Sequence, residues 1–190
     1  MVDAWQGRLV KLRAFVPADA EAALRQMEDS RHDYLSSAVN YPQPVHLARN
    51  ALAEGGGGGG GDEVRLAITR PEDRLIGWVG VFSADARDGS ARVGVGITDA
   101  AERRKRYASD ALCVLARHLL HERRYHRVEA HVYEFNAPSQ GLFRSLGFAE
   151  EGRLREAHFA DGRYWDVLVF GITAAEFDRI HPGYRLRWLE

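Results

Sequence analysis

The sequence predicts one α/β domain, in which helices cover the faces of a mixed β-sheet. Segments of alternating apolar and polar residues are interleaved with segments whose apolar residues recur at helical spacing, in the order β-α-α-β-β-β-α-β-α-β-β-α. The chain has 190 residues, of which 45% are hydrophobic, so it can bury a sizeable core as a single domain. We therefore expect residues 1–190 to form one unit without internal repeats.

In the N-terminal half, alternation and helical spacing predict four strands and two helices. A strand is expected over residues 8–15, and Pro17 is expected to open a helix over 18–29, because proline is well tolerated in a first helical turn. A second helix, a hairpin of two strands and a further strand are expected over residues 45–54, 63–70 with 75–83, and 91–97. The seven glycines at 55–61 predict a flexible surface connector, since glycine loses the most backbone entropy on ordering.

The C-terminal half is expected to contribute three helices and three strands. Apolar residues recur at helical spacing over residues 107–123, and a strand is expected over 127–133. Asn136 is expected to cap a short helix that ends at Leu146, where Gly147 is a natural stop. The last elements are expected to be strands near 154–159 and 165–172, a hairpin turn at Asp161-Gly162 between them, and a helix over 174–180 capped by Thr173.

Composition excludes several classes of protein and of site. The 26 basic and 27 acidic residues leave a net charge of -1, so a nucleic-acid partner is not expected. Cys113 is the only cysteine, which excludes an intramolecular disulfide and a zinc site of CxxC type. A lone cysteine also fits a reducing compartment, and we expect a cytoplasmic protein without a bound metal. No apolar run approaches the roughly 18 residues that indicate a membrane span, so no membrane partner is expected.

One segment has a much higher net charge than the chain as a whole. Residues 102–127 contain eight basic and three acidic side chains, a local charge of +5. The basic residues 103–106 lie where the strand that ends at Ile97 leads to the N-terminus of the long helix. A helix N-terminus has free backbone N–H groups and a positive dipole end, and arginines beside it make an anion site of pyrophosphate size. A solvated, arginine-rich loop is the alternative interpretation.

Three sequence blocks resemble a known family. Residues 93–112, VGVGITDAAERRKRYASDAL, resemble the acyl-CoA-binding segment of the GNAT superfamily of N-acyltransferases, in which Arg/Gln-x-x-Gly-x-Gly/Ala opens a long helix. The C-terminal block contains Asn136-x-x-Ser139, Leu146-Gly147-Phe148, Glu151-Gly152 and Gly162-x-Tyr164-x-Asp166. This spacing is similar to that of the branch that acetylates protein N-termini and small amines, the ribosomal-protein and spermidine acetyltransferase type. The opening strand and helix of the chain also resemble that branch.

The resemblance implies a fold, a co-substrate and a reaction. The fold is a mostly antiparallel mixed sheet splayed between its fourth and fifth strands, with helices on both faces and the pantetheine arm of acetyl-CoA in the gap. The implied cofactor-binding residues are Val95, Gly96, Ile97, Arg103, Arg104, Lys105, Arg106, Tyr107, Ala108, Asn136, Ser139 and Phe143. The implied reaction is acetyl transfer to a primary amine (of a protein N-terminus, a polyamine or a small molecule) by direct attack in a ternary complex. A homodimer formed through exposed sheet edges is a further expectation.

Two positions of the pyrophosphate loop depart from the family pattern. Arg104 and Arg106 stand where the family usually has glycine, which lets the backbone approach the phosphates and adopt unusual dihedral angles. Arg106 is expected either to obstruct that approach or to contact the pyrophosphate or the 3'-phosphate itself. Two alternatives therefore stay open. One is another acyl donor such as succinyl-CoA, and the other is a non-catalytic member that binds an anionic ligand through residues 103–106.

Three side chains are candidates for the chemistry of acetyl transfer. His158 lies on a predicted strand where the related branch has an acid/base group facing the acceptor, and histidine can accept a proton near neutral pH. His131 is a second candidate, because alternation places it with Glu129 and Tyr133 on one strand face. Ser139 matches the hydroxyl that the Asn-x-x-Ser branch places near the CoA sulfur. For both histidines, a solvated sheet face is the alternative.

The remaining positions bear on the thiolate and on the acceptor. Phe143 occupies the position at which many relatives carry a tyrosine, and a phenylalanine cannot donate a proton. Asn136 is expected to contact pantetheine as well as to cap its helix, with a cap alone as the alternative. Acceptor specificity is expected to come from the irregular, aromatic stretches 31–35 and 41–44, with contributions from Tyr164 and Trp165.

Overall fold

The computed structural model describes residues 3–27, 35, 44, 46–47, 50 and 63–184. Within them, seven strands form one sheet in the order β1-β2-β3-β4-β5-β7-β6. The strands are β1 (Lys11–Arg13), β2 (Val64–Thr69), β3 (Leu75–Asp85), β4 (Ser90–Ile97), β5 (Arg127–Tyr133), β6 (Ala149–Ala160) and β7 (Arg163–Thr173). Neighbouring strands are antiparallel except for β4 and β5, which run parallel. The mixed, mostly antiparallel sheet is therefore confirmed.

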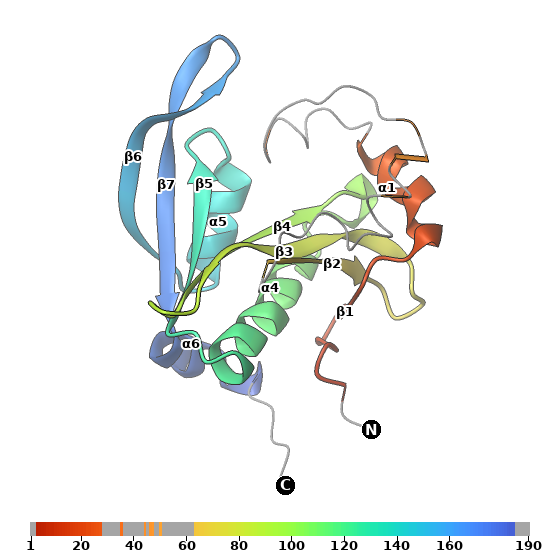
Figure 1. Cartoon of the computed structure of the whole chain (residues 1–190), viewed down its shortest axis with the longest axis horizontal. Coiled ribbons are helices and arrows are strands. Elements are labelled where there is room, and N and C mark those ends of the chain that lie inside the picture. The colour runs from red at the N-terminus through yellow and green to blue at the C-terminus, as the bar shows by residue number, and fades with distance from the viewer. Residues whose placement is uncertain are drawn as a thin grey trace, which may run out of the picture.

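The parallel pair of β4 and β5 is short. Its register runs from the pair of Ser90 with Arg127 to the pair of Arg92 with Glu129 and ends there. Beyond this point β4 pairs only with β3, and β5 only with β7. The two strands diverge, and in Figure 1 β5 and β7 rise away from β2–β4. The expected splay is confirmed, and the space between residues 93–97 and 130–133 is called the strand gap below.

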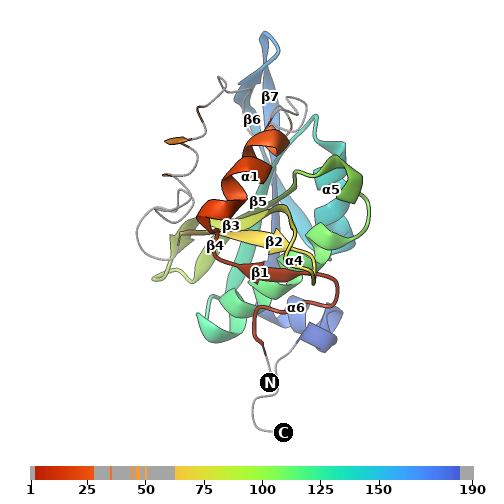
Figure 2. The ribbon, with the colours of Figure 1, turned by 90° about the vertical axis from the view of Figure 1, so that its right-hand side faces the viewer.

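Helices lie on both faces of the sheet. α4 (Tyr107–Arg117) and α5 (Ala137–Ser145) pack on the face that carries the buried core. α1 (Ala20–Met27) lies on the opposite side of β2–β4 (Figure 2), and this face, opposite α4, is called the second face below. The last helix, α6 (Ala174–Ile180), follows β7. Short helical turns occupy Pro17–Asp19, Ala100–Glu102, His118–Glu122 and Pro182–Tyr184.

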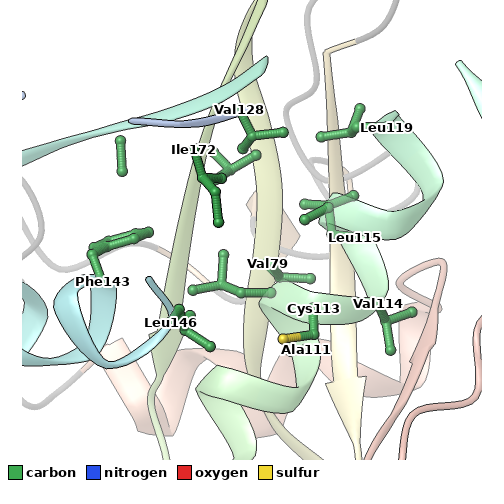
Figure 3. Packing of buried hydrophobic residues seen from close by; sticks show 14 of the residues in the cluster. Val79, Ala111, Cys113, Val114, Leu115, Leu119, Val128, Phe143, Leu146 and Ile172 are labelled. Carbon is green, nitrogen blue, oxygen red and sulfur yellow. The ribbon is translucent and has the colours of Figure 1, made fainter. Parts of the chain in front are cut away.

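The hydrophobic core lies between the sheet and the helices α4 and α5 (Figure 3). Apolar residues of α4 recur at helical spacing, so one side of the helix faces the strands. Leu115 of α4 lies in the same cluster as Val79, Val128 and Ile172 of β3, β5 and β7, and α5 contributes Phe143. This packing joins the two halves of the splayed sheet on the side of α4.

Two predicted elements begin differently in the structure. The strand expected over 8–15 is limited to β1, because the backbone N–H groups of Arg8, Leu9 and Val10 donate to the Asp110 carboxylate instead of to a neighbouring strand. The helix expected from residue 18 begins as a tight 3-10 turn and becomes α-helical at residue 20.

The long helix ends earlier as an α-helix than its sequence pattern predicts. The pattern covers residues 107–123, but the α-helical part stops at Arg117. One π-helical turn follows, in which the N–H of Arg123 donates to the carbonyl of His118 at 3.0 Å. The apolar residues Leu119 and Leu120 of this turn are still buried, so the hydrophobic pattern is satisfied by a different helical form.

Several local predictions are confirmed. Asn136 caps α5, Thr173 caps α6, and Gly147 ends α5 with a positive φ of 84°. Residues 161–162 form the turn between β6 and β7, with φ values of 51° and 75°. Both of these last strands are longer than predicted. The helix expected over 45–54 and the glycine connector at 55–61 lie outside the described residues, apart from residues 46, 47 and 50.

Asp110 fastens the N-terminal segment to α4. Asp110 is only 3% exposed. Its carboxylate accepts hydrogen bonds from the N–H groups of Arg8, Leu9 and Val10 at 2.7–3.0 Å. The Tyr184 hydroxyl donates to the same carboxylate. Buried backbone donors need an acceptor, so this carboxylate replaces the hydrogen bonds that a longer β1 would have made.

Replacing Asp110 with alanine is expected to lower the free energy of unfolding by about 2–4 kcal/mol, because the buried N–H of Val10 and three partly buried donors lose their acceptor. Urea unfolding followed by circular dichroism measures the loss. Asp88→Ala, in the exposed turn between β3 and β4, is the control and should change stability by less than about 0.5 kcal/mol. A loss for the Asp110 variant no larger than that of the control would contradict the role assigned to this carboxylate.

Candidate functional site

Two helix N-termini flank the strand gap. β4 and β5 run parallel, so their C-terminal ends lie at the same edge of the sheet, and α4 and α5 follow them there. The first N–H group of α4 to find a backbone acceptor is that of Asp110, which donates to Arg106 at 3.1 Å. In α5 the corresponding bond joins Gln140 to Asn136 at 3.1 Å. The preceding N–H groups of α4 are therefore available to an anion beside the gap.

The connector from β4 to α4 has an unusual backbone at two arginines. Arg104 has a φ of 64° and Arg106, the residue that precedes α4, a φ of 66°. These are left-handed conformations that glycine adopts freely and that cost other residues roughly 1–2 kcal/mol. The backbone thus takes the conformation that the family's glycines favour, although arginine stands at both positions.

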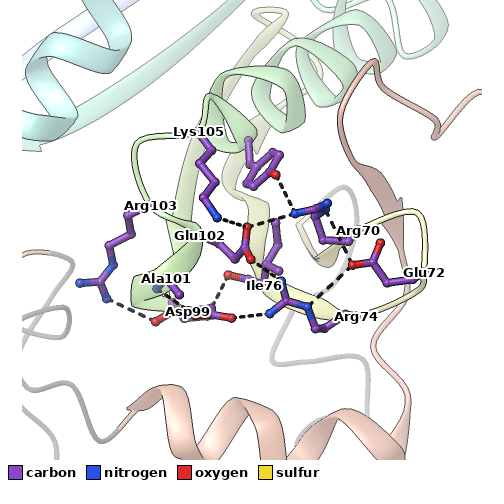
Figure 4. Close-up of polar contacts among 11 residues, drawn as sticks. Arg70, Glu72, Arg74, Ile76, Asp99, Ala101, Glu102, Arg103 and Lys105 are labelled. Atoms are coloured by element: carbon purple, nitrogen blue, oxygen red, sulfur yellow. Dashed lines mark hydrogen bonds and ion pairs between the residues drawn. The ribbon is translucent and has the colours of Figure 1, made fainter.

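A buried carboxylate holds this connector in place (Figure 4). Glu102 is 5% exposed and accepts hydrogen bonds from Arg74, from Arg70 at 3.2 Å and from Lys105 at 3.1 Å. The bonds from Arg74 and Lys105 lower the pKa of Glu102 to about 2. Asp99 accepts a further bond from Arg74 at 2.7 Å, so the turn between β2 and β3 is tied to the start of the connector.

The cations of the connector divide into two pairs. Lys105 turns inward to Glu102, and Arg103 donates to the carbonyl groups of Ile97 (3.0 Å) and Thr98 (3.3 Å) at the end of β4. Arg104 and Arg106 are exposed, and neither forms an ion pair or a hydrogen bond through its side chain with another described residue. Lys105 and Arg103 therefore stabilise the loop, whereas Arg104 and Arg106 present positive charge to the solvent.

The other predicted positions of this connector have specific contacts. The Tyr107 hydroxyl accepts a hydrogen bond from Arg70 at 2.7 Å, and Ala108 follows it in the first turn of α4. Residues 95–97 lie on the edge of β4 that has lost its β5 partner. The carbonyl of Ile97 accepts from Arg103, so this group is already used within the chain.

At the start of α5, the predicted residues have different surroundings. The Asn136 side chain accepts from the N–H of Ser139 at 3.1 Å and donates to the carbonyl of Leu35 at 2.8 Å. This second bond ties α5 to Leu35, which lies between α1 and β2 in the chain. Ser139 is half-buried, and its hydroxyl forms no hydrogen bond within the described part of the chain. Phe143 is only 2% exposed and packs on Phe148, with ring centroids 5.1 Å apart, so its side chain faces the core.

His158 lies in an aromatic cluster on the second face. Its ring stacks on that of Tyr133 with centroids 3.8 Å apart and an interplanar angle of 15°, and Phe135 and Trp165 lie beside it. The register of β6 shifts between Leu154 and His158, which brings the histidine opposite Trp165. Burial lowers the pKa of His158, and its Nε2 atom is buried without a partner among the described residues. This imidazole is neutral at pH 7 and retains an unused nitrogen.

His131 lies on the same face, nearer to the strand gap. Alternation along β5 buries Val128, Ala130 and Val132 toward the core and turns Glu129, His131 and Tyr133 to the second face, as predicted. Burial and the charge of Arg92 lower the pKa of His131. The two predicted histidines therefore share one face, and His158 stacks on Tyr133, which is two residues after His131 in β5.

The contacts that Glu102 makes are not predictable from the sequence. The charge count gives residues 102–127 as a net positive segment, although Glu102 binds Lys105 and two arginines from the β2–β3 turn. The one signal in the sequence is an acidic residue directly before four cations. Its partners Arg70 and Arg74 are about thirty residues distant in sequence, and no local spacing links them.

Comparison with known proteins identifies the family. The family model described as "Acetyltransferase (GNAT) domain" matches residues 9–149. The chain belongs to the GNAT superfamily. It is 29% identical, over 93% of its own length and 97% of the relative's, to the SPbeta prophage-derived uncharacterized N-acetyltransferase YokL of Bacillus subtilis (strain 168). The GNAT assignment makes the protein an acetyl-CoA-dependent N-acetyltransferase.

Solved structures agree in fold. An acetyltransferase structure from T. thermophilus has a TM-score of 0.79 at 24% identity and covers 95% of this chain and 94% of its own. A spermidine N-acetyltransferase from Vibrio cholerae, solved in complex with CoA and spermine, has a TM-score of 0.74 at 21% identity, with 89% and 98% covered. In the part of the chain described here, no group of three or more His, Cys, Asp or Glu residues is arranged to hold a metal ion. No helix within the described ranges is long and apolar enough to cross a membrane.

The role of Glu102 predicts a pH-dependent stability. Its pKa in the folded protein, about 2, lies below the ordinary value of 4.5, so the ionised group contributes stability that is complete above 4.5 and is lost as the pH falls toward 2. Glu102→Gln should therefore lower the melting temperature at pH 7, and the difference from the parent should shrink as the pH approaches 3. Differential scanning fluorimetry across this range measures both effects.

Glu72→Gln is the matched control for this experiment. Glu72 is exposed and lies 3.9 Å from both Arg70 and Arg74, so its replacement should change stability little at any pH. If the effect of Glu102→Gln is the same at pH 7 and pH 3, the ionised carboxylate does not stabilise the connector.

Proposed function

We propose that this GNAT acetyltransferase transfers an acetyl group from acetyl-CoA to a primary amine by direct attack within a ternary complex. One observation carries the proposal: β4 and β5 stop pairing at Arg92, so unpaired backbone and the N-termini of α4 and α5 surround the same gap. A thin, polar arm with an anionic head fits such a gap, because the strand edge offers hydrogen bonds and the helix N-terminus favours negative charge.

Arg104 and Arg106 are proposed to bind the phosphates of CoA. Both are exposed and unpaired with any other described side chain, and both have a positive φ, a backbone conformation that glycine adopts freely. Glu102 keeps Lys105 on the inner side of the connector, and Arg103 bonds to the end of β4, so these two residues support the loop. The remaining N–H groups before Asp110 complete the anion site.

The strand gap is proposed to hold the pantetheine arm. Val95 and Gly96 lie on the edge of β4 that no longer faces β5, and their backbone groups are suited to pair with the amides of the arm. A backbone N–H at this edge would polarise the thioester carbonyl as negative charge develops on its oxygen. At the start of α5, Asn136 and the hydroxyl of Ser139 lie on the other side of the gap.

The chemistry is proposed to need one base and one hydrogen-bond donor. The amine nitrogen forms a bond to the acetyl carbon, the carbon–sulfur bond breaks, and the amine proton passes to the unused Nε2 of His158. Because the pKa of His158 is lowered, its imidazole is neutral and ready to accept a proton at pH 7. The Ser139 hydroxyl donates to the departing thiolate. His131 is the second candidate base, since it faces the same side of the sheet.

The nature of the acceptor is part of this proposal. The Vibrio cholerae spermidine N-acetyltransferase was solved in complex with CoA and spermine, and spermine carries primary amines. The aromatic cluster around His158 and Trp165 is proposed to line the acceptor site of this chain. The aromatic cluster and the C-terminal sequence motifs together support assigning the chain to the branch that acetylates protein N-termini and small amines.

Glycine at positions 104 and 106 tests the phosphate contacts without changing the backbone. Glycine adopts a positive φ freely, so Arg104→Gly and Arg106→Gly remove only the side chains. Each should weaken CoA binding by about 3- to 10-fold, more at low salt than at high salt, because exposed charge contacts are screened. Isothermal titration calorimetry with CoA, acetyl-CoA and succinyl-CoA measures this and ranks the donors.

Arg87→Gly, in the exposed β3–β4 turn, is the control for lost positive charge. Its CoA affinity should equal that of the parent. Tighter binding by Arg106→Gly would show that the arginine obstructs the phosphates, and absence of binding by the parent protein to any CoA species would refute the proposed function.

The pH profile tests the proposed base. With a lowered pKa, His158 stays neutral until the pH falls below its ordinary 6.5, so kcat/KM should rise with pH through a midpoint below that value. His158→Gln should remove this limb and lower kcat by about 10²- to 10³-fold, with CoA affinity unchanged. His126→Gln, at an exposed residue, is the control. If His131→Gln loses activity while His158→Gln keeps it, the base is His131.

A further inference from the structure

Arg65 of β2 lies on the second face of the sheet, in line with the strand gap. Its register partner in β3 is Gly80, and the partner of Gly80 in β4 is Gly94. Gly94 is the second residue after Arg92, where β4 leaves β5. Paired residues of neighbouring strands point to the same face, so Arg65 shares this face with the histidines proposed to face the acceptor.

The Arg65 guanidinium rests on two aromatic rings. It lies 4.8 Å from the ring centroid of Trp78 and 5.8 Å from that of Phe82, and the two rings meet edge to face at 5.7 Å. Phe82 in turn covers Gly94, because a Cβ atom on that glycine would lie 2.8 Å from the Phe82 ring. The cluster of Arg65, Trp78 and Phe82 therefore extends from β2 to the border of the strand gap.

Arg65 has no acidic partner among the described residues. Burial lowers its pKa, and no carboxylate offsets this effect. Two other arginines of the sheet differ: Arg92, on the same face, lies 3.6 Å from Glu129, and Arg13 binds Asp19 at 2.7 Å. A half-buried guanidinium that is stacked on aromatic rings and keeps its donors unused is suited to a planar or tetrahedral anion.

The acidic side chains that strands β2–β5 place on this face are already occupied. Glu129 lies against Arg92, and Asp85 at the far end of β3 accepts the backbone N–H groups of Arg87 and Asp88 at 2.9 and 3.0 Å. In strands β2–β5, unpaired charge on the second face is thus positive. This charge distribution disfavours a second ammonium group on the acceptor and favours a negative one.

We propose that Arg65, with Trp78 and Phe82, binds an anionic group of the acceptor, so that the substrate is an amine that also carries a carboxylate or a phosphate. The inference rests on the proposed function, since it concerns the amine that the acetyl group reaches. The proposal narrows the expected acceptors from any primary amine to amino carboxylates and amino phosphates. Polyamines are then expected to be poor substrates.

A panel of acceptors with matched chain lengths tests this specificity. ω-Amino carboxylates of three to eight carbons are compared with their neutral amides, with α,ω-diamines and with ω-aminoalkyl phosphonates. Release of the CoA thiol from acetyl-CoA reports transfer. The carboxylates or the phosphonates should have kcat/KM values at least tenfold above those of the amides and the diamines, and the better of the two anionic series identifies the group.

Variants of Arg65 then assign the preference to this side chain. Arg65→Gln should raise KM for the preferred anionic acceptor at least tenfold, change kcat less than threefold, and leave the amides unaffected. Arg65→Lys should retain part of the preference, because it keeps the charge without the planar fork. Arg87→Gln, which removes an exposed charge from the β3–β4 turn, should behave as the parent.

Three results would overturn the inference. They are equal use of amides and carboxylates, a preference for diamines, and an anionic preference that Arg65→Gln leaves intact. Calorimetry with CoA on each variant separates these results from a failure of the proposed function. A protein that binds CoA and acetylates the neutral amines or diamines best keeps the function and loses the inference, whereas a protein that binds no CoA loses both.

Discussion

The early end of the pairing between β4 and β5 determines the rest of the site. A strand in the middle of a sheet normally has both edges satisfied, and an unpaired buried edge leaves backbone donors and acceptors that need partners. Here β4 keeps β3 and β5 keeps β7, so the sheet stays intact while five residues of β4 lose their second neighbour. Core residues of α4 and α5 join the two halves, and this packing allows the strands to diverge without separating the fold.

The same parallel pair brings the electrostatic features together. Since both strands end at one edge, the helices that follow them start at that edge, and their N-termini favour negative charge. The connector before α4 adds two exposed arginines in left-handed conformations, which cost free energy locally. The ion pairs of Glu102 hold the connector in place and offset part of that cost. An anion bound at the connector would neutralise the positive charge of the two exposed arginines.

Much of the fold could be predicted from the sequence, because its signals are local. The order of elements, the caps at Asn136 and Thr173 and the two faces of β5 follow from patterns within a few residues. The short β1 could not be predicted, since it depends on Asp110, about one hundred residues away. The contacts of Glu102 and the register that aligns Arg65 with Gly94 across β3 also depend on which strands become neighbours, and no local pattern encodes this.

The central claim is that CoA binds in the gap between β4 and β5, against the N-termini of α4 and α5. Hydrogen–deuterium exchange of the whole chain, with and without saturating CoA, measures this claim most directly. We expect slower exchange in peptides that cover residues 94–97, 104–109 and 137–140, with little change in β6 and α6. Protection confined to other segments, or none at saturation, would contradict the account.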